Sequence, residues 1–538
     1  MLDHWRIRGR DFIGRGIPGS MALGRAWDKS SLAVTRPHGR NHSENPGFGC
    51  GDGVGARSWT YFDGLILGLI ALIGAVLLAT LKPGQPWDGD AELYIRNALN
   101  IMSGADYRAS GYFVSPVEPH YPAAYPPGLP LLLIPVLHWF GINYVAMKVE
   151  LIFCFIAVLV LVAALARSRL SPPALVLLLI ALGLNPFVLM FKDVVYSEFA
   201  FMLCAYGAIL TVDRLDRQLA AGAKVMDCAV LILAAGIYMT AAISVRTAGI
   251  ALLAAALALI PFRSLRFGLA IAISLAISLG LKSALDQYFP SDVGSYAGNL
   301  DLWRHASLDQ ASDMLIISLR TYAFALVELI KGPANDAAWA VGLAFVLLGL
   351  AALRALRLGF SRPDFGLAFL AVSLAMLIVY PIAQEPARYA LPCLPLILIY
   401  AIEAVDRRAI VPVALMLGIL CAAGIWQRPA DDGLSVDRAD AHALYAEIKT
   451  LVPDDDVIIA SHPTVISLYT GRAATNPATG MTRDEFWTFA HQAGAHWLIA
   501  NAPPMIDHLR PISPDTSPGF DRVYTNGAFS LFRLTAAE

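Results

Sequence analysis

The sequence is poor in charged side chains. Asp, Glu, Lys and Arg make up only 15% of the 538 residues, whereas a soluble globular domain carries about 25%. Hydrophobic residues account for 57% of the chain, and the mean hydropathy is +0.58. This balance excludes an ordinary soluble protein and predicts a helical protein that crosses a membrane many times.

Metal-ligand clusters, disulfide patterns and basic surfaces are also lacking. The six cysteines are scattered, mostly within apolar runs, and show no Cys-x-x-Cys or Cys/His spacing. We therefore predict that the cysteines are small residues of the apolar core. No basic, aromatic-rich face occurs, so nucleic acid is not an expected partner. We predict no metal site and no certain cofactor, although the carboxylates leave open a weakly bound divalent cation.

Eleven apolar runs of about 15–20 residues are candidate spans within a transmembrane domain over residues 61–428. They are Gly64–Leu81, Lys148–Ala166, Ala174–Phe191, Val194–Val212, Cys228–Val245, Thr247–Pro261, Phe267–Leu281, Ala337–Ala352, Phe365–Tyr380, Tyr389–Val405 and Ile410–Trp426.

Basic residues concentrate in alternate loops, which the positive-inside rule places in the cytoplasm. Residues 1–60 fall on the same side and are rich in Gly and Arg. Because no apolar core follows Met1 closely, we expect a disordered basic cytoplasmic tail and no signal peptide. The basic loop residues are Arg167 and Arg169; Arg214, Arg217 and Lys224; Arg263 and Arg266; Arg354, Arg357 and Arg362; and Arg407 and Arg408.

The loops on the opposite side are longer and more acidic. The first covers residues 82–130, and a later one covers residues 284–336. Within the later loop, Asp313–Ile330 is amphipathic but is interrupted by Arg320 and Glu328. We therefore predict an interfacial helix on the outer face, since an extra span would break the charge rule.

Residues 429–538 have the composition of a soluble domain, and helical and strand-like patterns alternate along them. The sequence predicts a small α/β domain. With eleven spans and a cytoplasmic N-terminus, this domain would be periplasmic, attached to the inner membrane of a bacterium. The predicted helices are Ala441–Leu451 and Arg483–Ala493, and the predicted strands are Asp456–Ala460, His496–Ala500 and Phe529–Leu534.

The stretch from Trp87 to Tyr94, which follows the first span, holds three carboxylates. Carboxylates at the mouth of a span are costly to desolvate, so they lie in water or in a site that uses them. One interpretation is a solvated loop with Asp90 as a helix N-cap. The other is a catalytic carboxylate at the membrane surface. Asp88, Asp90 and Glu92 cannot all share one helix face, and we favour Asp90 over Asp88.

Polar and rigid features recur at the other predicted outer turns. Tyr125-Pro-Pro-Gly128 is a stiff turn back toward the membrane. Lys192, Asp193 and Glu198 lie in a very short loop between two spans. A topology anchor would need only the lysine, so the two acids favour a polar site.

Arg246 and Arg388 stand in outer turns, against the positive-inside trend, and Tyr389 follows the second of them. A guanidinium suits a phosphate through its planar fork of donors. The alternative is that both arginines extend to lipid headgroups. The residues thus predict an outer-face polar site able to hold an anion. Because no nucleotide sugar reaches that face, an activated donor would arrive through the lipid as a polyprenyl phosphate.

The order of these features resembles the GT-C membrane glycosyltransferases, in particular the branch of protein O-mannosyltransferases and the lipid A aminoarabinose transferase. The resemblance covers roughly residues 60–535, including the outer C-terminal domain. It rests on Asp90-Ala-Glu-Leu-Tyr94, Tyr125-Pro-Pro-Gly128, Tyr196-Ser197-Glu198, Arg246-Thr-Ala-Gly249 and Arg388-Tyr389-Ala-Leu-Pro392.

The resemblance implies an inverting transfer of a sugar from a polyprenyl-phosphate donor to a lipid, glycan or protein acceptor, as in lipopolysaccharide or protein glycosylation. Asp90 matches the family's first-loop aspartate, the general base. One departure is that many relatives carry a second acid directly after it, whereas here Ala91 precedes Glu92. The implied phosphate-binding residues are Arg246, Arg388 and Lys192, and the implied substrate-binding residues are Glu92, Tyr94, Tyr125, Asp193, Glu198 and Tyr389.

Other classes remain open at this point. A multi-spanning secondary transporter or lipid-carrier flippase is the main alternative, but the sequence shows no internal repeat and no clear mid-span acid. An O-antigen ligase or polymerase would usually have a long central outer loop. A membrane scaffold without activity is the third alternative.

Overall fold

The computed structural model describes residues 61–87, 89–112, 124–291, 302–332, 337–361, 363–380, 385–405, 418, 435–477, 481–501, 514–515 and 517–535. The helices and the C-terminal sheet belong to one contact unit, Trp59–Glu538.

Six helical segments among the described residues are long and apolar enough to cross a membrane, so the chain is a helical multi-span membrane protein. Each coincides with one of the eleven predicted spans. They are Tyr61–Ala79 (α2), Tyr144–Ala166 (α5), Met226–Val245 (η1, Met226–Cys228, with α9, Ala229–Val245), Leu265–Tyr288 (α11), Ala338–Gly359 (within α14, Ala338–Ser361) and Pro386–Ala404 (α16, Pro386–Ala390, η4, Leu391–Cys393, and α17, Leu394–Ala404).

Other predicted spans form shorter or more highly charged helices. Thr247–Pro261 corresponds to η2 (Thr247–Gly249), α10 (Ile250–Leu259) and η3 (Ile260–Phe262); Phe365–Tyr380 corresponds to α15 (Phe365–Val379); and Val194–Val212 corresponds to α8 (Glu198–Ala220). The last predicted span, Ile410–Trp426, lies outside the described residues apart from Gly418.

The predicted span Ala174–Phe191 does not form one continuous helix. The segment forms α6 (Pro172–Gly183) and α7 (Pro186–Phe191), with a break between them. Pro186 cannot donate a backbone hydrogen bond and disfavours a helical residue before it. Asn185 instead accepts from the Phe187 amide and donates to the Leu329 carbonyl at 2.7 Å.

A helix also forms over the predicted interfacial segment. This helix, α13 (Leu308–Lys331), starts with a capping box between Ser307 and Gln310. Its first turns are exposed, whereas its last turns are buried against α14 and α16. Its place at the membrane surface stays a prediction.

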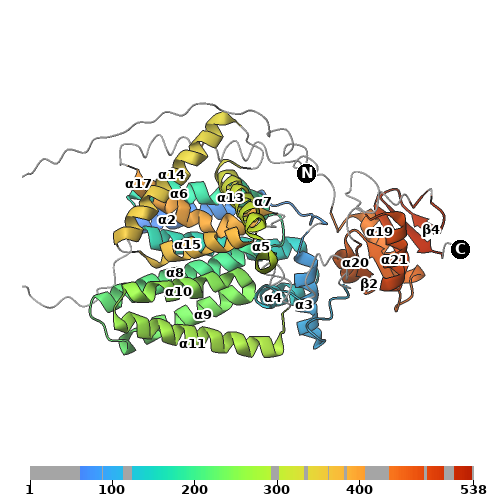
Figure 1. Cartoon of the computed structure of the whole chain (residues 1–538), viewed down its shortest axis with the longest axis horizontal. Coiled ribbons are helices and arrows are strands. Elements are labelled where there is room, and N and C mark those ends of the chain that lie inside the picture. The colour runs from blue at the N-terminus through green and yellow to red at the C-terminus, as the bar shows by residue number, and fades with distance from the viewer. Residues whose placement is uncertain are drawn as a thin grey trace, which may run out of the picture. The chain divides into compact units, whose positions relative to one another are not determined.

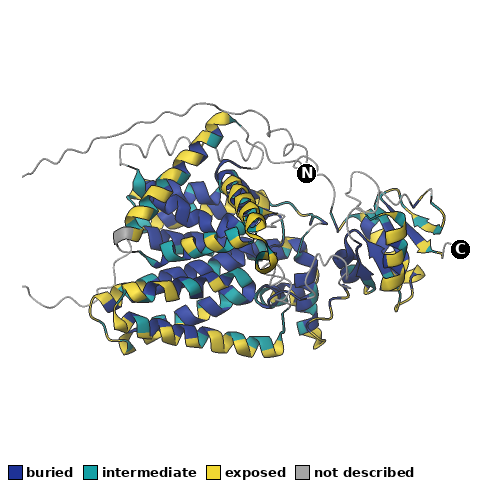
Figure 2. Ribbon diagram, viewed as in Figure 1, coloured by how far each residue is buried: buried dark blue, intermediate teal, exposed yellow. Residues whose placement is uncertain are grey.

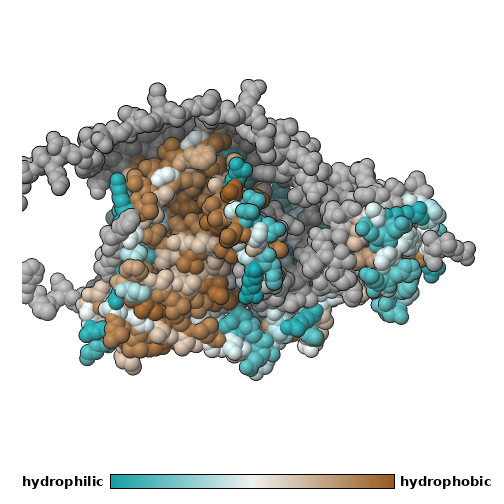
Figure 3. Space-filling model, viewed as in Figure 1, coloured by the Kyte–Doolittle hydropathy of each residue, from teal (hydrophilic) through white to brown (hydrophobic). Residues whose placement is uncertain are grey.

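The outer surfaces of the helices are apolar, as lipid contact requires. Helices such as α11 and α14 alternate exposed and buried faces (Figure 2), and large apolar side chains occupy the exposed ones, including Ile273, Leu279, Phe345 and Val346. Figure 3 shows this apolar surface over the helices and a hydrophilic surface over the C-terminal domain. Apolar faces of this extent are normally covered by lipid or protein.

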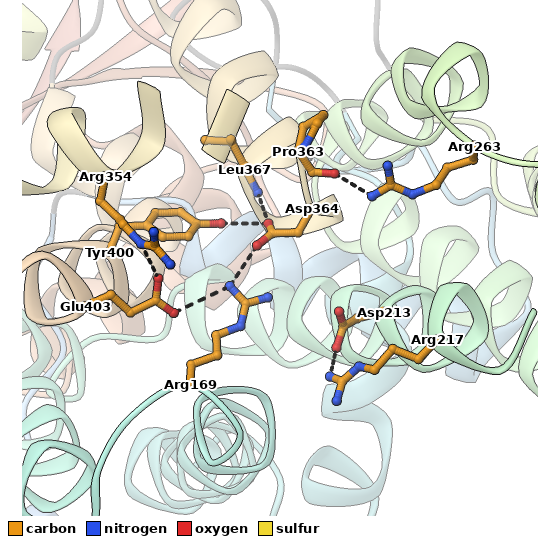
Figure 4. Close-up of polar contacts among 10 residues, drawn as sticks. All are labelled: Arg169, Asp213, Arg217, Arg263, Arg354, Pro363, Asp364, Leu367, Tyr400 and Glu403. Atoms are coloured by element: carbon orange, nitrogen blue, oxygen red, sulfur yellow. Dashed lines mark hydrogen bonds and ion pairs between the residues drawn. The ribbon is translucent and has the colours of Figure 1, made fainter. Parts of the chain in front are cut away.

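Ion pairs and hydrogen bonds connect several helix ends on one side (Figure 4). Asp364 accepts from Arg169 at 2.7 Å and from the Tyr400 hydroxyl at 2.8 Å. Arg263 donates to the Pro363 carbonyl at 2.5 Å. We call this set the Asp364 network; its members are Arg169, Asp216, Arg263, Arg354, Asp364, Tyr400 and Glu403.

The Asp364 network brings together loops that the charge pattern predicts to share a side. Arg263 pairs with Asp216 at 3.0 Å, and Arg354 pairs with Glu403 at 3.0 Å. Side chains from all five predicted cytoplasmic loops, or from the helix ends beside them, therefore meet. Which side of the membrane they face stays a prediction.

The C-terminal domain has a mixed five-stranded sheet in the order β2-β1-β3-β5-β4. Strands β2, β1 and β3 are parallel, and β5 runs antiparallel to β3 and β4. All five predicted elements form, and α20, β2 and β4 were not predicted. The elements are α19 (Ala439–Leu451), β1 (Val457–Ala460), α20 (Pro463–Thr470), β2 (Ala473–Thr475), α21 (Arg483–Ala493), β3 (Ala495–Asn501), β4 (Phe520–Thr525) and β5 (Phe529–Leu534).

The two faces of the sheet bury different partners. Ile459, Leu498 and Phe532 pack with Phe486 and Phe489 of α21. The neighbouring residues along the strands point the other way, because side chains alternate in a strand. Those residues belong to the larger core that also includes Trp87 of the first outer loop.

The C-terminal domain is bonded to the first outer loop through α3 (Ala91–Ser103), which packs against both α4 (Gly128–Phe140) and α20 (Figure 1). The Ala474 amide donates to the Gly111 carbonyl at 3.1 Å. Arg96 donates to the carbonyls of Ser467 at 2.6 Å and Leu468 at 3.2 Å. A basic side chain on these last-turn carbonyls stabilises the end of α20.

We expect Arg96→Leu to loosen the C-terminal domain from α3. The change removes charge-assisted hydrogen bonds worth about 1.5–3 kcal/mol each. Hydrogen exchange should show faster exchange of the α20 amides, while the α5 amides stay protected. Arg108→Leu is the matched control, since Arg108 is exposed and reaches the Pro290 carbonyl only at 3.5 Å. Equal protection of α20 in both variants would contradict the expectation.

Candidate active site

Asp90 occupies the N-cap position of α3, but its side chain makes no capping hydrogen bond. Its carboxylate instead accepts from the Tyr125 hydroxyl at 2.7 Å and from Arg388 Nη2 at 2.5 Å. The interpretation of Asp90 as a helix cap in a solvated loop is therefore wrong. Its carboxylate belongs to a polar cluster between the first outer loop and α16.

Two arginines meet at one carboxylate oxygen beside Asp90. Arg388 Nε lies 2.5 Å from Glu198 Oε1, and Arg246 Nη1 pairs with the same oxygen. Arg246 also donates to Ser197 Oγ at 2.9 Å, and the Tyr94 hydroxyl donates to that Oγ at 3.2 Å. We call this set the Asp90 cluster; its members are Asp90, Tyr94, Tyr125, Ser197, Glu198, Arg246 and Arg388.

The charged side chains of the Asp90 cluster point inward. The exposed fraction is 1% for Glu198, 7% for Arg388, 13% for Arg246 and 16% for Asp90. The alternative interpretation, in which the two arginines extend to lipid headgroups, is therefore wrong, because both guanidinium groups are buried in the cluster. The sequence-based expectation that these residues converge agrees with the geometry.

Local backbone features place each charge. Glu198 lies in the first turn of α8, where the helix dipole favours an acid. Arg246 is extended, with φ −147° and ψ 138°, at the break between α9 and η2. This break is tight. A Cβ on Gly128 would lie 2.7 Å from the Ser244 carbonyl, and one on Gly249 would lie 2.5 Å from the Ile243 amide nitrogen.

Aromatic rings line the cluster. The rings of Tyr94 and Tyr125 lie 4.7 Å apart between centroids. The Arg388 guanidinium lies over the Tyr196 ring at 3.7 Å, and Arg246 lies 5.3 Å from the Tyr389 ring centroid. Such cation–π contacts hold a guanidinium in place without neutralising its charge.

The cluster is electrically balanced, with two carboxylates against two guanidinium groups. Burial alone would raise the pKa of Asp90, but the Arg388 charge and the Tyr125 hydrogen bond outweigh it and lower the pKa. Asp90 is therefore ionised at neutral pH. Glu385 adds a third acid at the edge, with its half-exposed carboxylate 3.5 Å from Arg388.

Glu92 lies outside the cluster. Two residues further along α3 than Asp90, it is fully buried and accepts a hydrogen bond from the Tyr144 hydroxyl at 3.3 Å. Its Oε2 has no hydrogen-bond partner among the described residues. Burial raises the pKa of Glu92 to about 8, so this carboxyl is largely protonated at neutral pH.

Lys192 and Asp193 pair with each other at 2.7 Å, beside the end of α2. Lys192 Nζ also donates to the Thr80 carbonyl at 2.6 Å, and Asp193 accepts from the Lys82 amide at 2.9 Å. These contacts hold the chain where it leaves α2.

Sequence reasoning did not assign a role to Tyr196, Ser197, Tyr144 or Glu385. Tyr196 and Ser197 directly precede Glu198 and belong to the motif Tyr196-Ser197-Glu198, which gave neither of them a role of its own. Nothing in the sequence distinguishes Tyr144 from other tyrosines at the start of a span. Asp88, the rival to Asp90, lies outside the described residues.

The Asp90 cluster and the Asp364 network lie at opposite ends of the same helix. Glu198 begins α8, and Asp216 of the Asp364 network lies near its end. Eighteen residues of α-helix span about 27 Å, close to the roughly 30 Å of a bilayer's hydrocarbon core. The Asp90 cluster and the Asp364 network are therefore separated along α8 by about the thickness of that core.

Among the described residues, no group of three His, Cys, Asp or Glu side chains is arranged to hold a metal ion. Asp90 and Glu198, the two acids in the cluster, are already paired with arginines. The arrangement suits an anion that competes for those guanidinium groups better than it suits a divalent cation.

The chain matches no protein-family model, and no curated protein matches it. Its structure is similar to the archaeal oligosaccharyltransferase AglB from Archaeoglobus fulgidus, solved with an inhibitory peptide and a dolichol-phosphate. The TM-score is 0.55 at 12% identity, over 87% of this chain and 74% of that chain. A variant of the arabinofuranosyltransferase AftD from Mycobacteria gives a TM-score of 0.52 at 14% identity, over 88% of this chain and 42% of that chain.

ArnT from Cupriavidus metallidurans, solved with undecaprenyl phosphate, aligns over 88% of this chain and 99% of that chain, at 12% identity and a TM-score of 0.41. That score is too low to carry an argument. The likeness to AglB and AftD shows that the chain has the fold of the GT-C membrane glycosyltransferases. At such low identity it assigns neither a substrate nor a site residue.

We expect the free energy of unfolding to fall as the pH rises from about 4.5 to about 8, because of Glu92. Its folded-state pKa of about 8 exceeds the ordinary 4.5, so the folded state binds the proton more tightly than the unfolded state. The stabilisation is complete below the ordinary pKa and is lost as the pH rises through the folded pKa, at about 1.4 kcal/mol per pKa unit.

Thermal unfolding in detergent across this pH range measures the effect. Glu92→Gln should flatten the curve, because glutamine does not titrate. Glu447→Gln on α19 is the control and should keep the wild-type slope. A wild-type slope in Glu92→Gln would show that another group causes the pH dependence.

Proposed function

We propose that the chain is an inverting glycosyltransferase. It moves a sugar from a polyprenyl-phosphate donor to a lipid, glycan or protein acceptor at the outer face of the cytoplasmic membrane. The observation that carries the proposal is the buried cluster in which Arg388 pairs with Asp90, while Arg388 and Arg246 both pair with Glu198. The GT-C fold supports it, as does the dolichol-phosphate in the AglB structure.

In the proposed reaction Asp90 acts as the general base. The acceptor hydroxyl attacks the anomeric carbon of the sugar, and Asp90 takes its proton. The bond between that carbon and the phosphate oxygen breaks, and the electron pair leaves with the polyprenyl phosphate. Arg246 and Arg388 stabilise the negative charge that develops on the leaving group.

The other predicted site residues differ in how directly their contacts support a role in the reaction. Tyr94, Tyr125 and Tyr389 line the cluster and suit the role of pocket walls. Lys192 and Asp193 act in the proposal through the end of α2, where they bond to the Thr80 carbonyl and the Lys82 amide.

We expect Asp90→Asn to lower transfer by about 10²–10⁴-fold, the usual contribution of a general base. The assay uses purified protein with a panel of radiolabelled polyprenyl-phosphate sugars and membrane acceptors. Asp106→Asn is the control, because Asp106 lies in the same outer loop but is exposed, and its carboxylate accepts from the nearby Arg108 amide. Asp88→Asn tests the preference for Asp90. Full turnover by Asp90→Asn would contradict the assignment of Asp90 as the general base.

The proposal also places residues 1–60 in the cytoplasm and residues 429–538 in the periplasm. An alkaline phosphatase reporter fused after Glu538 should be active, because that enzyme matures only outside the cytoplasm. A green fluorescent protein fused at the same position and exported through the Sec pathway should stay dark. A fluorescent fusion without phosphatase activity would mean that the number of spans is even rather than odd.

A further inference from the structure

Glu198 is an unusual carboxylate within the Asp90 cluster. Its Oε1 accepts from both Arg246 and Arg388, whereas its Oε2 is buried without a hydrogen-bond partner among the described residues. The side chain is only 1% exposed. One oxygen held by two guanidinium groups is the arrangement expected for a non-bridging oxygen of a bound phosphate.

Arg388 connects this oxygen to the proposed base. Its Nε contacts Glu198 and its Nη2 contacts Asp90, both at 2.5 Å. The guanidinium thus bridges the two acids, and the charges of the cluster cancel. A phosphate that entered this arrangement unchanged would find no free positive charge and would meet two carboxylates.

We propose that Glu198 is an internal substitute for the donor phosphate, and that the donor releases Asp90 by taking over the two arginines. This inference rests on the proposed function and deepens it. In the empty site Glu198 holds Arg246 and Arg388 in place and keeps them neutralised. When the phosphate binds, the guanidinium groups change partners from carboxylate to phosphate, and no covalent bond changes.

The exchange makes the base available only when the donor is present. Arg388 cannot keep its full contact with Asp90 while it turns toward the phosphate. Asp90 then loses the charge that lowers its pKa, whereas its burial remains. It becomes a stronger base as the donor arrives, and the donor binds before the acceptor is activated.

The decisive probe is polyprenyl phosphate without a sugar. If Glu198 competes with the phosphate, Glu198→Gln should bind this carrier about tenfold more tightly than wild type, a difference of about 1.4 kcal/mol. Binding is measured by intrinsic tryptophan fluorescence in lipid nanodiscs. If Glu198 instead holds the donor's sugar, the variant would bind the sugar-free carrier as wild type does, which would overturn the proposal.

Glu385→Gln is the matched control for charge alone. It removes one negative charge from a half-exposed carboxylate that touches Arg388 only at 3.5 Å. Its effect on carrier affinity should stay below about fivefold, because an exposed ion pair contributes at most about 1 kcal/mol. An equal gain in both variants would show general electrostatics rather than exchange at the shared oxygen.

Glu198→Gln leaves two buried guanidinium groups facing one carboxylate, so the variant can lose stability. Added acetate should then restore the stability, because a free carboxylate replaces the one removed. Glu198→Asp keeps the negative charge and serves as the conservative variant.

A second test needs only the wild-type protein and its pH profiles. The acid limb of kcat reports the enzyme with bound donor, and the acid limb of kcat/KM for the donor reports the free enzyme. If the donor releases Asp90, the acid limb of kcat should lie at higher pH than that of kcat/KM. Coincident limbs would overturn the proposal.

These outcomes separate the two levels of inference. Wild-type protein that binds no polyprenyl phosphate and transfers no sugar would refute the proposed function itself. Wild-type protein that binds the carrier and transfers sugar, together with a Glu198→Gln variant of unchanged affinity, would refute only the role of Glu198.

Discussion

Arg388 bridges Asp90 and Glu198, and three distant parts of the chain meet through this bridge: the start of α3, the start of α8 and the turn that leads into α17. Burial of such charges is costly, and removal of one partner leaves the others uncompensated. These helix ends are therefore arranged around charge balance. The two close glycine contacts near Arg246 lie in the same region: Gly128 lets α4 approach α9, and Gly249 lets η2 fold closely against the end of α9.

Much of the candidate site could be predicted from the sequence, because a charge beside an apolar span is conspicuous. Asp90, Glu198, Arg246 and Arg388 were all found on that basis, and they form one cluster. The direction of a side chain could not be found in the same way. Asp90 and Glu92 stand two residues apart at the start of a helix, about 200° around its axis, and packing alone decides which acid reaches the arginines.

The same limit applies to the fold. Long apolar runs predicted the main helices, but the break at Asn185 and Pro186 was missed because hydropathy does not register a proline within an apolar run. Lys192 and Asp193 were predicted as site residues because they are charged, and their contacts with the Thr80 carbonyl and the Lys82 amide beside the end of α2 could not be foreseen from charge alone. In the C-terminal domain, β2 is three residues long, and β4 is mostly exposed with no alternation of apolar and polar residues, so neither shows the pattern that predicts a strand.

The helix that begins with Asp90 is also the surface on which the C-terminal domain sits. Arg96 of α3 holds the end of α20, and Trp87 of the same outer segment packs against His462 and Phe529. A chain of hydroxyls runs from Glu92 through Tyr144 and Tyr469 to Asp437. The soluble domain therefore shares its interface with the segment that carries the proposed base, and a shift of one displaces the other.

The length of α8 has a consequence for how a carrier lipid would reach the Asp90 cluster. With Glu198 at one end of α8 and the Asp364 network about 27 Å away at the other, the proposed membrane placement puts the Asp90 cluster at the depth of the lipid headgroups. A carrier lipid would not have to be lifted out of the bilayer to present its phosphate, and its tail could stay among the acyl chains. Delivery then becomes a two-dimensional search by lateral diffusion, governed by the density of carrier in one leaflet rather than by its concentration in water.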